Sequence, residues 1–117
     1  MNTLVNNPYY IEMLKRNRLL PFFVDGKMKC LITYFIGNGN AEKYVGKDSW
    51  AVVDDEPKTG TVAYIDQMIT DHEVNHKFSK IVWNILINHI KENYPQVKQL
   101  RWNRYKNGIV KTYKKEM

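Results

Sequence analysis

The sequence predicts an α+β domain with a central, mostly antiparallel sheet, an N-terminal helix and one long amphipathic helix. Two observations indicate this class. Short apolar runs bounded by turn-forming residues are typical of strands, and one long run with helical periodicity stands between two strand-like runs. The chain has 117 residues, of which 44% are hydrophobic, and this suits one ordinary domain with its own core. Residues 1–117 are therefore predicted to form a single domain.

The first predicted element is a helix over residues 8–20. Pro8 is tolerated in the first turn of a helix, because the amide hydrogen that it lacks has no helical partner there. Apolar side chains then recur at helical spacing, at Tyr10, Met13 and Leu14. This stripe predicts that one face of the helix packs on the sheet.

A β-hairpin is predicted next, with strands over 22–24 and 27–36. Asp25-Gly26 between them supplies the positive φ angles of a tight two-residue turn. The second strand holds the single cysteine, Cys30, in the apolar run CLITYFI. We expect its thiol to be buried and unreactive.

A second hairpin is predicted from strands over 50–53 and 61–69, joined by the loop 54–60. The later strand is apolar on both faces, as expected of a strand in the middle of a sheet. One face is predicted to carry Val62, Tyr64 and Met68, and the other Ala63, Ile65 and Ile69.

The long helix is predicted to end at Asn93, ahead of Pro95. Its start is open between two positions. Thr70 and Glu73 have the spacing of a capping box, which would begin the helix directly after Thr70. Alternatively, the helix begins after Asn75. Its apolar face is predicted from Phe78, Ile81, Val82, Trp83, Ile85, Leu86 and Ile90.

A strand over 97–102 is predicted after this helix, and the segment that follows is open between a helix and a hairpin. The helix would carry three apolar side chains on one face: Tyr105, Ile109 and Tyr113. Asn107-Gly108 instead indicates a turn that joins strands over 101–105 and 109–113. This local chemistry favours the hairpin.

The net charge is +6, and the C-terminal segment carries all of it. Residues 98–116 contain one acid, Glu116, and seven bases: Lys98, Arg101, Arg104, Lys106, Lys111, Lys114 and Lys115. This basic segment indicates an anionic ligand, such as a nucleic acid, an acidic protein or a phosphorylated cofactor. The alternative is a solvated face that keeps the protein soluble.

The sequence predicts no membrane partner, since no apolar run approaches the roughly 20 residues that span a bilayer. The N-terminus also lacks the pattern of a signal peptide. Together with a single cysteine, these features predict a reducing, cytoplasmic setting.

Four consecutive runs carry a resemblance to a known family: TVAYIDQMIT, DHEVNHKFSK, IVWNILINHIKENYP and VKQLRW. As a strand, a turn, a helix and a second strand, they resemble the centre of the GCN5-related N-acetyltransferase (GNAT) fold, in a short form. The run VKTYKKE is similar to a late helix of that family, in which a tyrosine precedes basic residues. RWNRYK resembles short, glycine-poor relatives encoded by bacteriophages, which implies a host cytoplasm.

The resemblance implies that the chain binds an acyl-CoA, acetyl-CoA in particular. It implies either an active enzyme that transfers the acyl group to an amine or a degenerate relative that has lost this activity. It implies Asp66 as the general base and Tyr113 as the acid that protonates the leaving thiolate. The amides of Phe78 and Ser79 would bind the pyrophosphate. The implied cofactor-binding residues are His76, Lys77, Phe78, Ser79 and Lys80.

The phosphate turn departs from the family pattern Arg/Gln-x-x-Gly-x-Gly/Ala, because it contains no glycine. The first turn of a helix can still bind phosphate through its free amides and dipole.

A competing motif is His-Glu-x-x-His, formed by His72, Glu73 and His76. On one helix the two imidazoles would lie one turn apart and could bind Zn²⁺, with Glu73 as the base for a water molecule. His89 or Glu92 would have to supply a third ligand. The alternative is that these residues are exposed in the first turn, with Glu73 closing a cap.

A third class of function is binding without catalysis. Trp102, Tyr105 and Tyr113 alternate with arginines and lysines in the segment 98–116. Aromatic rings stack on bases while cations neutralise phosphates, so this segment is a candidate for binding nucleic acid. A host protein bound by surface complementarity is the other candidate.

Overall fold

The computed structural model describes residues 7–38, 57–71 and 75–117. Its elements are α1 (Pro8–Lys15), β1 (Leu19–Val24), β2 (Lys27–Gly37), β3 (Val62–Thr70), α2 (His76–Asn93), β4 (Gln99–Lys106) and β5 (Ile109–Glu116). The five strands form one sheet in chain order. The pair β3–β4 is parallel and the other pairs are antiparallel. The predicted α+β class with a mostly antiparallel sheet is confirmed.

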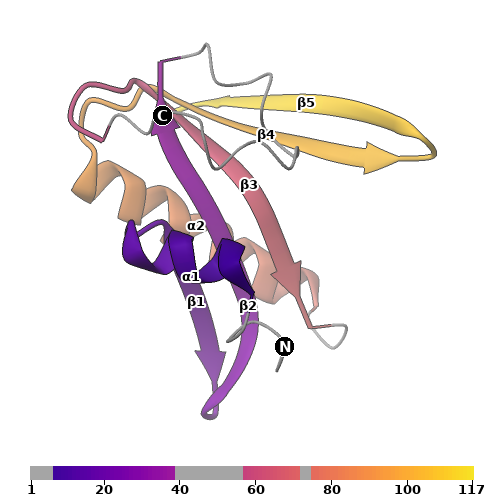
Figure 1. Cartoon of the computed structure of the whole chain (residues 1–117). Helices are drawn as coiled ribbons and strands as arrows, with labels where there is room; N and C mark the ends of the chain where they lie inside the picture. The colour runs from indigo at the N-terminus through magenta and orange to yellow at the C-terminus, as the bar shows by residue number, and fades with distance from the viewer. Residues whose placement is uncertain (1–6, 39–56, 72–74) are drawn as a thin grey trace.

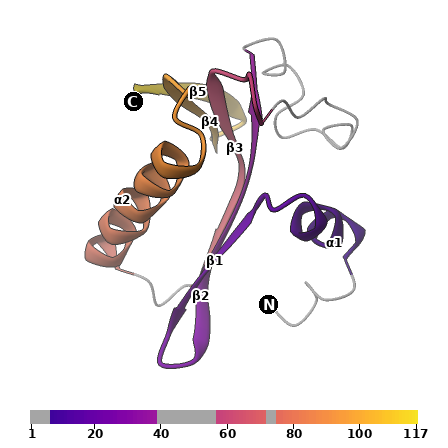
Figure 2. The same cartoon turned by 90° about the vertical axis from the view of Figure 1, so that its left-hand side faces the viewer.

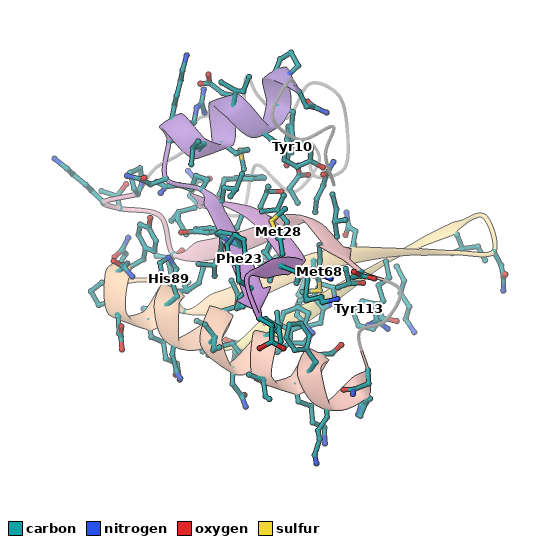
Figure 3. All side chains as sticks on the ribbon, turned by 90° about the horizontal axis from the view of Figure 1, so that it is seen from below. Tyr10, Phe23, Met28, Met68, His89 and Tyr113 are labelled. Atoms are coloured by element: carbon teal, nitrogen blue, oxygen red, sulfur yellow. The ribbon has the colours of Figure 1, made fainter. Side chains whose placement is uncertain are left out.

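The two helices cover opposite faces of the sheet (Figure 2). Figure 3 shows the same arrangement from below, with Tyr10 on α1 at one face and His89 on α2 at the other. Neither helix among the described residues has the length and apolarity to cross a membrane.

Helix α1 is shorter than predicted. Asn7 caps it by accepting the Tyr9 amide at 2.9 Å, and Pro8 occupies the first turn. The helix ends at Lys15 because Asn17 adopts a φ of 57°, which turns the chain into β1. Leu19 and Leu20, the latter predicted at the end of the helix, are therefore strand residues.

The first hairpin is confirmed. Asp25 and Gly26 have φ angles of 51° and 77°, the left-handed pair that a tight hairpin turn requires. Cys30 on β2 is fully buried, as predicted, and burial raises the pKa of its thiol to about 11. The thiol therefore remains protonated near neutral pH.

Strand β3 is the central strand of the sheet, as its apolar faces predicted. The strand predicted over 50–53 and the first three residues of its loop, 54–56, lie outside the described residues.

The side-chain alternation of β3 changes partway along the strand. Tyr34 pairs with Ile65 but Thr33 pairs with Gln67, so the register shifts by one residue and Asp66 is the bulged residue of β3. Such a β-bulge moves the following side chains to the other face. Met68, predicted on the face of Val62 and Tyr64, accordingly packs on the opposite face with Ile65 and the α2 core. That part of the prediction is wrong.

Helix α2 begins at His76, and its N-cap Asn75 has extended backbone angles. The later of the two predicted starts is thus confirmed. The predicted capping box at Thr70 is wrong, because Thr70 is the last residue of β3 and does not cap a helix. Asn93 ends the helix as predicted. The buried face is narrower than the predicted one, since Ile81 and Ile85 are 53% and 46% exposed.

The C-terminal segment forms a hairpin, so the alternative of a terminal helix is wrong. Asn107 and Gly108 have φ angles of 53° and 79°, and β4 and β5 pair on either side of them. The pairing brings Trp102 opposite Tyr113.

The sheet separates two buried clusters. On the face of α1, Met13 packs with Phe35, Val62 and Tyr64. The larger cluster, on the face of α2, contains Cys30, Ile32, Tyr34, Ile36, Ala63, Ile65, Val82, Leu86, Ile90, Val97 and Leu100.

Candidate functional site

The parallel strands β3 and β4 separate partway along their length. They pair from Val62 with Gln99 to Ile65 with Trp102, and the described residues show no further β3–β4 pair. Beyond these pairs β3 runs to Thr70 and β4 to Lys106, and the two strands diverge (Figure 1). We call this divergence the strand fork. Its inner edges expose backbone groups that a ligand could pair with.

Asp66 lies at the base of the strand fork, because it directly follows the last β3 residue paired with β4. It is also the bulged residue of β3. Bulges re-aim side chains and are common next to active sites. The sequence-predicted base therefore occupies the position where the fork opens.

The carboxylate of Asp66 is held from helix α1. The Tyr9 hydroxyl donates to Asp66 Oδ2 and lies 2.6 Å from Thr33 Oγ1. Burial and this hydrogen bond to Asp66 raise the pKa of Tyr9, so its phenol remains a neutral donor. Next to this pair, the Tyr10 hydroxyl donates to Gln67 Oε1 at 2.5 Å.

Sequence reasoning did not find Tyr9 as a partner of Asp66, since the two residues are 57 positions apart. No local spacing links them. Only the packing of α1 on the sheet brings them together.

The first turn of α2 is partly occupied by its own cap. Asn75 Oδ1 accepts the Phe78 amide at 2.9 Å, and the carbonyl of Asn75 accepts the Ser79 amide at 3.2 Å. The amides predicted to bind pyrophosphate are thus engaged within the protein, which corrects that detail of the site. His76 and Lys77 precede them in the first turn, where amides have no helical acceptor.

The side chains at this end of α2 remain accessible. His76, Lys77 and Lys80 are exposed, whereas Phe78 and Ser79 are half-buried and Phe78 packs against the α2 core. The end of the helix therefore offers positive charge near the strand fork, on an apolar support.

A groove of about 320 Å³ lies between α2 and the β4–β5 hairpin. Its walls are Lys80, Trp83, Asn84 and Ile87 of α2 with Trp102 and Lys115 of the hairpin. Sequence reasoning assigned Trp83 to the apolar helix face and overlooked Asn84. The pairing of Trp83 with a tryptophan on β4 depends on tertiary packing.

Tyr113 lies on β5 and stacks on Trp102, with ring centroids 5.6 Å apart and an interplanar angle of 12°. Arg104 and Lys111 are 5.8 and 5.5 Å from the centre of the Tyr113 ring. The prediction of Tyr113 as the acid depended on a terminal helix, and that helix does not form. Tyr113 therefore has no helical position from which to reach a leaving thiolate.

Of the zinc motif, only His76 is described, as the first residue of α2 after the extended N-cap Asn75. His72 and Glu73 lie outside the described residues. The two candidate third ligands lie at the C-terminal end of α2, away from His76. His89 Nε2 lies 3.1 Å from the Tyr34 hydroxyl, and Glu92 is exposed. Across residues 7–38, 57–71 and 75–117, no group of three metal-ligating side chains occurs.

Among solved structures, the chain is similar to the GphF GNAT-like decarboxylase in complex with isobutyryl-CoA. The match covers 85% of this chain with a TM-score of 0.64 and 12% sequence identity. The chain spans about half of that protein, 51% of its length. No protein-family model and no curated protein matches the sequence. At this identity the likeness shows the fold, which is GNAT-like.

Proposed function

We propose that this chain is an acyl-CoA-dependent N-acyltransferase, with acetyl-CoA as the first donor to test. The observation that carries the proposal is the strand fork with the bulged Asp66 at its base. Support comes from the GNAT-like fold and from the acyl-CoA in the complex of the similar protein.

The residues around the fork suit the parts of such a donor. Beyond Ile65 and Trp102 the strands β3 and β4 do not pair with each other, and their facing edges would offer backbone donors and acceptors for the amides of a pantetheine arm. Met68 and Phe78 pack against the core beside the fork and provide an apolar lining. Lys77 and Lys80 would provide positive charge for the diphosphate.

When bound, acyl-CoA supplies an activated acyl group on a thioester. The role that we propose for Asp66 is to accept the proton of the amine that attacks the thioester. The C–S bond then breaks, and the departing thiolate takes a proton from water. Tyr9 would hold the Asp66 carboxylate in place through its hydroxyl, and Thr33 would orient that hydroxyl in turn. Asp66 is half-buried, so part of its side chain is accessible to an amine.

Thermal unfolding of the full chain with and without acetyl-CoA tests the binding step. A ligand that binds the native state raises the melting temperature, and we expect a rise of several degrees at a saturating dose. No rise would refute the proposal.

Release of free thiol from acetyl-CoA, with a panel of polyamines and lysine peptides, tests the transfer step. The substitution Asp66→Asn should abolish thiol release while the thermal shift persists. Asp25→Asn, the same change in the exposed turn of the first hairpin, is the matched control and should leave both unchanged. Undiminished thiol release by Asp66→Asn would remove Asp66 as the base.

A further inference from the structure

We propose that the face of the β4–β5 hairpin beside α2 binds single-stranded nucleic acid. We call this surface the aromatic–basic face. It consists of Lys80, Trp83 and Asn84 from α2, Trp102 and Arg104 from β4, and Lys111, Tyr113 and Lys115 from β5.

The hairpin divides its side chains between two faces. Trp102 contacts Trp83 of α2 with ring centroids 5.0 Å apart, so alternate β4 residues such as Arg104 point to the same side. On β5, Tyr113 stacks on Trp102 and Lys115 lines the groove. Three aromatic rings from three elements thus form one continuous row.

Positive charge surrounds this row. Lys80 and Lys115 flank the groove, and Arg104 and Lys111 lie within 6 Å of the Tyr113 ring centre. Glu116, the single acid of the segment 98–116, accepts a hydrogen bond from Gln99 at 2.7 Å on the other face of the hairpin. A surface with this charge is complementary to a polyanion.

The aromatic rings indicate a polyanion with unstacked bases. A single strand presents base faces that stack on tryptophan and tyrosine, whereas a duplex keeps those faces buried. The groove beside Trp83 has a volume at the lower end of ligand pockets, which run from about 300 to 1,000 Å³. This size suits one base, with the Asn84 amide available to its polar edge and lysines at both rims for the phosphates.

Lys80 is shared with the proposed diphosphate site. The row of aromatic rings, Arg104 and Lys111 have no role in the proposed binding of acyl-CoA. The two proposals can therefore fail separately.

The test uses fluorescence anisotropy of labelled 12-mer oligo-dT and oligo-dA with the full chain over a range of salt concentrations. Lys115→Gln and Lys114→Gln form a matched pair, because the two exposed lysines are adjacent on β5 and point to opposite faces. Lys115→Gln should weaken binding several-fold and reduce the slope of log K against log salt by about 0.7, the value for one phosphate contact in a single strand. Lys114→Gln should leave affinity and slope near those of the parent.

Stacking is tested with Tyr113→Ala, which should weaken binding about tenfold, within the range measured for loss of one stacked base. A 12-base-pair duplex should bind more weakly than either single strand. Melting curves establish whether each variant is folded. If Tyr113→Ala does not fold, the comparison of Lys115→Gln with Lys114→Gln still tests the proposal.

Four results would overturn the proposal. These are absence of saturable binding at low salt, equal losses in Lys114→Gln and Lys115→Gln, equal affinity for duplex and single strand, and complete displacement of the oligonucleotide by equimolar acetyl-CoA. The last result would assign the face to the nucleotide end of the donor.

Discussion

The hydroxyl of Tyr9, on the first helix, donates a hydrogen bond to the carboxylate of Asp66 on the central strand. This bond ties α1 to the base of the strand fork. The helix therefore does more than cover one face of the sheet, since it also fixes the orientation of the residue that we propose as the base.

Tyr9→Phe should lower the free energy of unfolding by about 1 kcal/mol, since the lost hydrogen bond involves a charged acceptor that is partly exposed to water. Urea denaturation measures the change. Tyr10→Phe removes a hydroxyl bonded to the neutral amide of Gln67 and should cost less. Equal losses of unfolding free energy in Tyr9→Phe and Tyr10→Phe would show that the charge of Asp66 does not strengthen its hydrogen bond to Tyr9.

Asn75→Ala should destabilise the protein by about 1 kcal/mol, the usual cost of losing an N-cap, because the Phe78 amide then loses its acceptor. Asn75→Ser keeps a capping oxygen and should be close to the parent. Thermal denaturation followed by circular dichroism distinguishes them, and equal melting temperatures for all three proteins would contradict the cap.

Leu86→Ala should cost about 2–5 kcal/mol, since Leu86 is fully buried in the α2 core and its truncation leaves a cavity. Ile85→Ala, one residue earlier and 46% exposed, is the matched control and should cost under about 1 kcal/mol. Chemical denaturation measures both losses. A larger loss for Ile85→Ala than for Leu86→Ala would mean that α2 is rotated about its axis.

The pKa of Cys30 predicts a loss of stability at alkaline pH. Burial raises this pKa from 9.0 to about 11, so between these values the native state holds a proton that the unfolded chain has released. This contribution to the free energy of unfolding is complete below pH 9 and is lost as the pH rises through 11, by about 3 kcal/mol in all. Unfolding free energies at pH 8, 9 and 10 measure the slope.

Cys30→Ala is the control for this slope, because raised tyrosine pKa values add a similar alkaline loss in both proteins. The parent should lose more stability than the variant between pH 9 and 10. The same dependence of unfolding free energy on pH in both proteins would contradict the raised pKa of the Cys30 thiol. The same burial predicts negligible alkylation of native Cys30 by iodoacetamide at pH 8.

The features that the sequence predicted correctly are encoded by neighbouring residues. Asp25-Gly26 and Asn107-Gly108 each adopt the left-handed pair of angles that their chemistry favours. At the C-terminus this turn chemistry prevailed over a helical spacing of three apolar residues. A two-residue turn imposes its geometry directly, whereas a sparse stripe needs a surface to pack against.

The features that escaped prediction depend on contacts between distant segments. The bulge at Asp66 reverses the side on which Met68 lies, and no local pattern marks an extra residue in a strand. The row formed by Trp83, Trp102 and Tyr113 likewise appears only when helix and hairpin are packed. Asp66 was predicted from the sequence because the family resemblance implied a base on its strand. The resemblance implied no role for its partner Tyr9.

The four residue pairs between β3 and β4 form a narrow junction within an otherwise continuous sheet, since β4 and β5 pair at eight positions. Opening of this junction would expose amide hydrogens of the outer hairpin to exchange with solvent while β1, β2 and β3 stay paired. Such a protein would unfold in two cooperative units, and the weaker unit would be the one that carries most of the positive charge.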